Sequence, residues 1–184
     1  MGRGKLIDPS KLARIFISPQ TRAKRTYELL FDSVTRKEFE GRVEITEDVR
    51  EWEYGIYEGL LTSEIRTSRK ERGLDKEKPW DIWHDGCEGG ESVEEVSKRL
   101  DKLIARIRAI QSPFMHGERG ADVVVLAHGH SLRAFAKRWV DFKLEMKLPL
   151  MLEPGAVGVL SYEHHKIDEP ALLLGFNMGA EKRK

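Results

Sequence analysis

Side chains suited to binding an oxyanion follow two apolar runs of this sequence. Ser18 and Arg22 come directly after the first run, and His128 and Arg133 come after the second. Arginine offers paired N–H donors that match phosphate oxygens, and imidazole and hydroxyl groups add further hydrogen bonds. Each residue alone is more typical of a surface arginine or a structural histidine. The same chemistry at the ends of two strands favours a phosphate-binding site.

A second group of residues that could do chemistry is acidic. Glu51, Glu53 and Glu58 lie close together, next to the aromatic side chains of Trp52 and Tyr54. An apolar pocket raises the pKa of a carboxyl group and can make it a general acid. The local sequence fits an ordinary acidic loop, whose aromatic side chains fill the core, better than it fits a general acid. It does not single out one of the three acids.

The sequence gives little support for a metal site or for a catalytic cysteine. His128 and His130 are two residues apart and His164 is followed by His165, but no cysteine pair and no His-Glu-x-x-His motif accompanies them. Cys87 precedes an acidic residue, which would raise the pKa of the thiol rather than lower it. We therefore expect neither a metal site nor a cofactor.

Strands and helices must alternate to bring the two strand ends together. Apolar runs predict strands, and stripes of apolar residues three or four positions apart predict helices. The run at residues 123–127 is apolar on both faces, as expected of a central parallel strand. Ser92 and Glu95 form a capping box that opens one helix. The predicted strands are 14–17, 43–45, 123–127, 157–162 and 172–174, and the predicted helices are 23–34, 59–72, 93–110 and 131–139, with a loop at 79–91.

This alternation predicts an α/β fold: a three-layer α/β/α sandwich around a mainly parallel sheet. In such sheets ligands bind beyond the carboxyl ends of the strands. If the two strands are parallel neighbours, Ser18, Arg22, His128 and Arg133 lie at one rim. Two arginines and a histidine near helix N-termini would then form an anion site, since those termini supply free amides and the positive end of the helix dipole.

The composition is that of one soluble globular domain, which we assign to residues 1–184. Of the 184 residues, 40% are hydrophobic and 34% are charged, and the net charge is +1. This balance argues against a protein dedicated to nucleic acid or to a membrane surface. No apolar run has transmembrane length, no secretory signal is present, and the single cysteine fits a reducing compartment. We therefore expect a cytoplasmic location.

The charge is unevenly spread along the chain. Residues 1–25 contain seven Lys and Arg against one acid, whereas residues 26–100 contain twelve against twenty. Arg3 and Lys5 either attract an anion or belong to a solvated terminus. The interpretation as a solvated terminus does not extend to Arg22, because Arg22 follows a predicted strand.

Taken together, four motifs resemble those of the histidine phosphatase superfamily, also called the phosphoglycerate mutase-like family. They occur in the family's order and at its spacing, and the resemblance runs from about Leu12 to Leu174. The segments around Tyr54, Cys87 and Tyr162 look most like the fungal sedoheptulose-1,7-bisphosphatase branch. The four motifs are Ser18-Pro19-Gln20-Thr21-Arg22-Ala23-Lys24-Arg25-Thr26, Glu51-Trp52-Glu53-Tyr54-Gly55-Ile56-Tyr57-Glu58-Gly59, Gly90-Glu91-Ser92 and Ala127-His128-Gly129-His130-Ser131-Leu132-Arg133.

The resemblance implies a metal-independent phosphatase that acts on a sugar phosphate or bisphosphate. Arg22 would clamp the phosphate, and His128 would hydrogen-bond the phosphoryl oxygens. Glu51 would protonate the leaving alkoxide, a proton transfer that fits a carboxyl group held neutral by its surroundings. Ser18 and Arg133 would contact the other end of a bisphosphorylated sugar. The resemblance favours a phosphatase over a mutase. It does not identify the sugar. Whether the protein forms a homo-oligomer also stays open.

One element of the family pattern is absent. The family's nucleophile is a histidine in an Arg-His-Gly motif that ends the first strand, and no such motif precedes Ser18. Arg3 and Gly4 do not form it, and His84, the first histidine, lies in the predicted loop. We therefore expect an N-terminally truncated phosphatase whose first strand is missing, which would leave unpaired sheet edges. The alternatives are a pseudoenzyme that binds a phosphometabolite or a protein partner, and an unrelated α/β binding domain.

Overall fold

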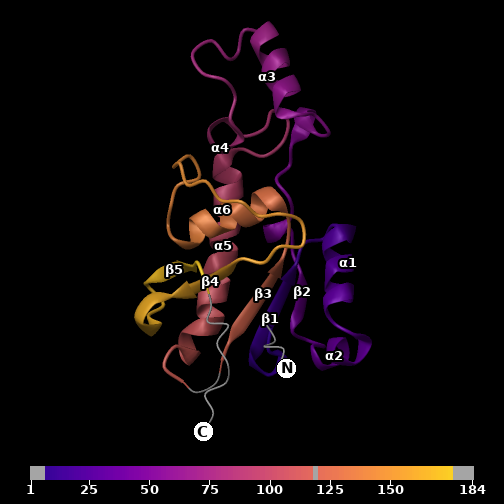
Figure 1. Cartoon of the computed structure of the whole chain (residues 1–184), viewed down its shortest axis with the longest axis vertical. Helices are drawn as coiled ribbons and strands as arrows, with labels where there is room; N and C mark the ends of the chain where they lie inside the picture. Colours follow the sequence, from indigo (N-terminus) through magenta and orange to yellow (C-terminus); the bar gives the residue numbers. More distant parts are fainter. Residues whose placement is uncertain (1–6, 118–119, 176–184) are drawn as a thin grey trace.

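The computed structural model describes residues 7–117 and 120–175 (Figure 1), so Arg3 and Lys5, the expected anion-attracting terminus, lie outside it. Strands and helices alternate along most of the chain, as predicted. The strands are β1 (Leu12–Ile17), β2 (Val43–Ile45), β3 (Asp122–Leu126), β4 (Val159–Tyr162) and β5 (Pro170–Leu173), and the α-helices are α1 (Thr21–Leu30), α2 (Ser33–Glu38), α3 (Thr62–Glu71), α4 (Ile82–Asp85), α5 (Val93–Gln111) and α6 (Gly129–Trp139).

A parallel sheet of three strands, in the order β2-β1-β3, forms the centre of the molecule. Ile17 at the end of β1 lies opposite Ile45 of β2 and Leu126 of β3. The carboxyl ends of all three strands therefore meet at one rim. Because β1 has a neighbour on each edge and helices over each face, Ile15 and Phe16 have no exposed surface.

Helices cover both faces of this sheet, which gives three layers (Figure 1). Alternate side chains of a strand point to opposite faces. Ile15 and Ile17 accordingly join the core beneath α1 and α2, and Phe16 joins the larger core beneath α5 and α6. The predicted α/β/α sandwich with a mainly parallel sheet is confirmed.

Two predictions about these elements are wrong. β3, predicted to be central, pairs with β1 alone among the strands that the structure describes, and β1 is the central strand. A valine run indicates an apolar environment but not how many neighbours a strand has. The helix predicted over residues 23–34 ends at Leu30, because Asp32 accepts a hydrogen bond from the Thr35 N–H (2.8 Å) and starts α2. Val34, assigned to its apolar stripe, is 68% exposed.

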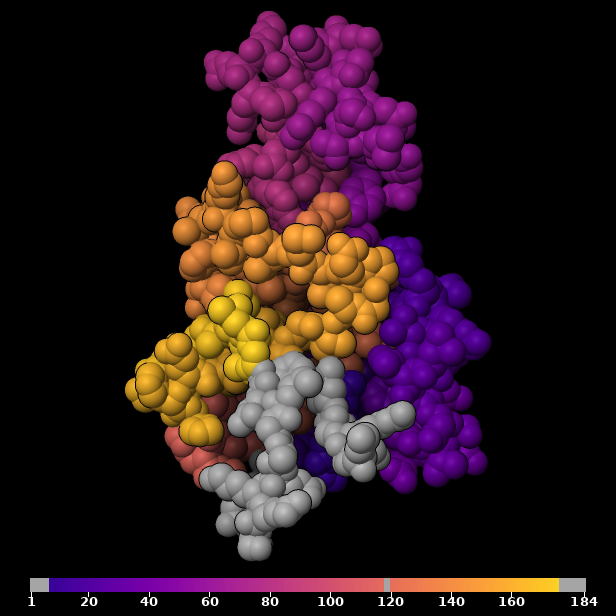
Figure 2. Space-filling view, viewed as in Figure 1, coloured from indigo at the N-terminus to yellow at the C-terminus, as the bar shows by residue number. Residues whose placement is uncertain are grey.

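Helices α4 and α5 both begin at side-chain caps. At the start of α5, Ser92 Oγ accepts a hydrogen bond from the Glu95 N–H (3.2 Å), and Glu95 Oε2 accepts one from the Ser92 N–H (2.9 Å), as predicted. The predicted loop at 79–91 contains the short helix α4, whose N-cap Asp81 accepts from the Trp83 N–H (3.2 Å). The segment that bears α3 projects from one end of the molecule (Figures 1 and 2).

The late strands form a separate antiparallel pair, in which Leu160 lies opposite Leu172. This pair is attached to α6 through Trp139, whose Nε1 donates to the Ser161 carbonyl (3.1 Å) and whose ring lies 5.1 Å from that of Tyr162. Both late strands were predicted, but they do not join the parallel sheet. None of the helices in the described part of the chain is long and apolar enough to cross a bilayer.

Candidate active site

Ser18, Arg22 and His128 meet at the rim where β1 and β3 end. The register brings them there, since the Ser18 N–H continues the sheet by donating to the Leu126 carbonyl (2.9 Å). Arg22 Nε lies 2.8 Å from His128 Nδ1, and His128 Nε2 lies 2.7 Å from Ser18 Oγ. Contacts across more than a hundred residues thus join two of the sequence motifs, as the parallel arrangement predicts.

The hydrogen bonds fix the protonation of His128. Arg22 Nε can only donate, so Nδ1 is the acceptor, Nε2 carries the proton, and Ser18 Oγ accepts it. Burial, together with the neighbouring Arg22 charge, lowers the pKa of His128 to about 4. The imidazole is therefore neutral at pH 7, and Arg22 is the cation of the cluster. Arg22 is exposed and forms no ion pair with a carboxylate among the residues that the structure describes.

We expect the imidazole of His128 to stay neutral, with its proton on Nε2, until the pH approaches 4. Two-dimensional ¹H–¹⁵N NMR of the imidazole nitrogens measures both the pKa and the tautomer. The folded pKa lies below the ordinary value near 6.5, so the stability that this histidine contributes is complete above pH 6.5 and falls as the pH drops toward 4. A midpoint near 6.5 for His128 would contradict the hydrogen-bond assignment.

Glu51 reaches the same rim, which distinguishes it from the other two acids of its segment. Its Oε1 accepts hydrogen bonds from the backbone N–H groups of Trp52 (3.0 Å) and Ser131 (2.9 Å), and its Oε2 accepts one from that of His130 (3.4 Å). The last two N–H groups belong to the first turn of α6. Glu53 and Glu58 are exposed instead.

A buried carboxylate holds the Glu51 segment in place, and sequence reasoning missed this role. Glu91 is 5% exposed, and its two oxygens accept from Arg99 Nε (2.7 Å) and Nη2 (3.0 Å). Arg50 Nη2 lies 3.1 Å from Glu91 Oε1, and the Glu53 N–H donates to Oε2 (3.0 Å). The residues on both sides of Glu51 are thus fixed to Glu91. The Gly90-Glu91-Ser92 motif was the signal that could have indicated it.

The remaining predicted site residues lie near the cluster in different ways. Ser18 is fully buried, and its hydroxyl faces His128. Arg133 lies in the first turns of α6, where its Nε donates to the Gly129 carbonyl (3.0 Å) and its guanidinium sits 5.6 Å from the centre of the Trp83 ring. The roles predicted for Ser18 and Arg133 toward a substrate stay predictions.

Cys87 and the histidine pairs were weighed above as a nucleophile and as metal ligands. Burial, followed by the charges of Glu91 and Glu58, raises the pKa of the Cys87 thiol to about 12, so it is protonated at neutral pH. The predicted direction is confirmed, but its cause differs: burial comes first, and the acids that contribute are Glu91 and Glu58 rather than the adjacent Glu88. Within residues 7–117 and 120–175, no group of three or more histidine, cysteine and acidic side chains is placed to hold a metal ion. The site is thus a single exposed arginine joined to a neutral histidine, beside a carboxylate.

Comparison with known proteins gives a consistent result. The chain is 38% identical to the sedoheptulose 1,7-bisphosphatase of Saccharomyces cerevisiae over 203 residues, covering 92% of the chain and 75% of that protein. It is 35% identical to an acid phosphatase of Mycobacterium tuberculosis over 121 residues, but it spans only about half of that protein (52%), and 66% of this chain is covered.

Solved structures and family models agree with this likeness. The structure of an open reading frame product from Mycobacterium tuberculosis superimposes with a TM-score of 0.58 at 29% identity, over 88% of this chain and 70% of that one. The model of the histidine phosphatase superfamily (branch 1) matches residues 4–172. The chain belongs to the histidine phosphatase superfamily.

Proposed function

We propose that this chain binds a phosphorylated sugar for metal-independent hydrolysis of its phosphate ester. The observation that carries the proposal is the contact between Arg22 and His128 (2.8 Å), which places a free arginine and a neutral imidazole at the end of two parallel strands. The likeness to a sedoheptulose bisphosphatase supports a sugar phosphate as the substrate class. A transferring phosphoryl group carries spread negative charge, which positioned arginine and histidine donors stabilise.

Each group at the rim has a defined part in this reaction. Arg22 and His128 hold the phosphoryl oxygens, while Ser18 orients the imidazole and Arg133 contacts the sugar. A histidine nucleophile attacks phosphorus, the phosphorus–oxygen ester bond breaks, and the leaving alkoxide takes a proton from Glu51. Water then attacks the phosphohistidine, Glu51 accepts the proton of that water, and the histidine and inorganic phosphate are released.

The nucleophile of this reaction is not supplied by these 184 residues. The chain has six histidines; none follows an arginine and precedes a glycine. Of the two nearest the rim, His128 is bonded to Arg22 and Ser18, and His130 to the Tyr54 hydroxyl (Nδ1–Oη 2.8 Å). Without a histidine in such a motif, these residues also allow a second candidate function, a pseudoenzyme that binds phosphorylated metabolites without turnover.

Binding and turnover measured side by side separate these functions. We expect the 184-residue chain to bind inorganic phosphate by calorimetry and to release none from fructose 1,6-bisphosphate. A chain extended upstream by a strand that ends in Arg-His-Gly is expected to hydrolyse the ester without added metal and to form a phosphohistidine. Strong metal-free turnover by the 184 residues would overturn the missing nucleophile. Failure of the extended chain would favour the pseudoenzyme, and failure to bind phosphate would exclude both functions.

A further inference from the structure

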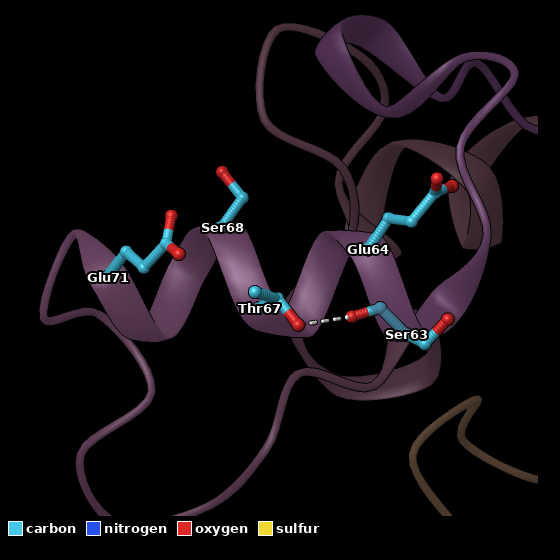
Figure 3. Close-up of a pocket in the computed structure, with 5 residues that line it drawn as sticks. All are labelled: Ser63, Glu64, Thr67, Ser68 and Glu71. Carbon is cyan, nitrogen blue, oxygen red and sulfur yellow. Dashed lines mark hydrogen bonds between the residues drawn. The ribbon is translucent and has the colours of Figure 1, made fainter.

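Exposed polar side chains find hydrogen-bond partners in the solvent, as on the outer face of α3 (Figure 3). The hollow there is lined by hydroxyl and carboxylate side chains that are all exposed: Ser63, Glu64, Thr67, Ser68 and Glu71. Lys137 of α6 is the opposite case, because it is 4% exposed and still bears an amine. A charge removed from water destabilises a fold unless fixed partners replace the water. The partners of this cation therefore indicate what it does.

The Lys137 ammonium joins α6 to two other segments of the chain. Its Nζ donates to the backbone carbonyls of Leu144 (2.8 Å) and Met146 (3.0 Å), which lie in the chain that follows α6. The same nitrogen lies 4.3 Å from the centre of the Trp83 ring in α4. An ammonium has three N–H donors, so two serve the carbonyls and one is left for the aromatic face. Burial lowers the pKa of Lys137, although the charge of Asp81 acts in the opposite direction.

The Trp83 ring depends on contacts with the rest of the protein, because the helix that bears it is short. α4 has four residues, Ile82–Asp85, and its N-cap Asp81 accepts a hydrogen bond from the Trp83 N–H (3.2 Å). A single helical turn is not stable by itself. A cation over an aromatic face contributes most where water is excluded. Lys137 is buried and lies nearer the ring centre than Arg133 (5.6 Å), so it is the stronger of the two cations on this ring.

The Trp83 ring contacts two of the residues that hold Glu51. It meets the Trp52 ring edge to face, with 5.8 Å between the ring centres, and it lies 5.7 Å from the His130 ring. The backbone N–H groups of the same two residues donate to Glu51, from Trp52 to Oε1 (3.0 Å) and from His130 to Oε2 (3.4 Å). Any shift of the Trp83 ring is therefore passed to two hydrogen bonds of the carboxylate.

We propose that Lys137 is a positioning residue for Glu51 and acts through Trp83. The ammonium holds the Trp83 ring, and the ring holds Trp52 and His130 where their N–H groups reach the carboxylate. Lys137 itself touches no reacting atom. The proposal rests on the function proposed above for its catalytic purpose, since Glu51 is the proton donor there. The positioning can be measured without turnover.

Amide hydrogen exchange at the Glu51 donors, followed by NMR in the 184-residue chain, tests this role. Lys137→Met nearly conserves the volume of the side chain and removes its charge. We expect the N–H groups of Trp52 and His130 to exchange about tenfold faster in this variant, as loss of a buried cation–π contact would give. Exchange of the Ile15 N–H, in the central strand β1, reports global unfolding, and an equal rise there is subtracted as global destabilisation.

Arg138→Met is the matched control, because it removes the neighbouring cation of α6. Arg138 Nη1 donates to the Phe142 carbonyl (2.9 Å), in the same chain that follows α6, and its Nε pairs with Asp101 (2.8 Å). Among the contacts within residues 7–117 and 120–175, none joins Arg138 to Trp83. We therefore expect exchange at the Glu51 donors to stay within about twofold of the unmodified chain.

Two further variants test the route and the charge. If Lys137 acts through the ring, Trp83→Leu gives the same faster exchange, and adding Lys137→Met to it has no further effect. Lys137→Arg keeps a cation that stacks on aromatic rings, so we expect it to recover most of the protection lost in Lys137→Met. A side chain that only filled space would give the reverse order, because methionine fits the volume of lysine better than arginine does.

The role of Lys137 is overturned by any of three results. The first is equal acceleration in Lys137→Met and Arg138→Met, which would show a general loosening of the chain after α6. The second is an effect of Lys137→Met that persists in full beside Trp83→Leu, and the third is no recovery in Lys137→Arg. Phosphate binding by the unmodified chain is measured in parallel: its absence overturns the proposed function, whereas unaccelerated exchange with phosphate still bound overturns the role of Lys137 alone.

Discussion

Arg22→Ala is expected to weaken the binding of inorganic phosphate by about 10- to 100-fold. Among residues 7–117 and 120–175, Arg22 is the one cation whose guanidinium touches His128, and hydrogen bonds to a charged group contribute about 1.5 to 3 kcal/mol. The side chain is exposed, so its removal leaves the cores on both faces of the sheet intact. Calorimetric titration with phosphate, compared with the unmodified chain, measures the loss.

Arg25→Ala is the matched control for this change. Arg25 lies one turn further along α1, is exposed, and pairs with Glu28 (2.7 Å). Both variants lose one positive charge, so a general electrostatic effect would weaken binding equally in the two. Arg22→Lys is expected to recover only part of the affinity, because an ammonium lacks the planar pair of donors. Equal losses for Arg22 and Arg25 would remove the case for a specific clamp.

Glu91→Gln is expected to lower the free energy of unfolding by about 3 kcal/mol. The change removes one charge from a buried cluster and leaves Arg99, whose side chain is 12% exposed, without its ionic partner. Breaking a buried ion pair by removing one partner typically costs 3–5 kcal/mol, and about the lower figure applies because glutamine keeps some hydrogen bonds. Equilibrium unfolding in urea measures the difference.

Glu88→Gln provides the comparison for Glu91. Glu88 also pairs with an arginine, Arg72 (2.9 Å), but its side chain is 48% exposed. Such surface pairs contribute about 0–1 kcal/mol. If the two variants lose the same stability, burial of the Glu91 cluster has no energetic consequence and its proposed role in fixing the Glu51 segment fails.

The pH dependence of stability gives a second measurement on Glu91. Burial alone would raise the pKa of this carboxyl, but the hydrogen bonds and charge of Arg99 outweigh burial and lower it below its ordinary value. The stabilisation is therefore complete above about pH 4.3, the value for an unfolded chain, and declines as the pH falls through the lower folded pKa. In Glu91→Gln this decline should become shallower.

The sequence predicts the layers of this fold well because each depends on local pattern. Apolar runs marked β1 and β3, the alternating Val43-Glu44-Ile45 marked β2, and the Ser92–Glu95 box marked the start of α5. The central strand was misjudged because a strand's neighbours are set by pairing across the chain, which a run of valines does not encode. The assignment of all 184 residues to one domain stays a prediction.

The site was predictable only in part, for the same physical reason. Arg22 and His128 could be placed at one rim from strand direction alone. The choice of Glu51 among three acids came from the family resemblance, since its contact with the Ser131 N–H spans eighty positions of sequence. The link from Glu91 to Arg50 is likewise a tertiary contact.

The contact between Arg22 and His128 has a thermodynamic consequence. The proposed anion-binding groups follow two different strands, β1 and β3, so an unfolded chain holds no preformed site. Phosphate bound only by the native form adds to its stability by mass action, about 2.7 kcal/mol at a free concentration one hundred times the dissociation constant. The melting temperature of this protein should therefore rise with phosphate concentration.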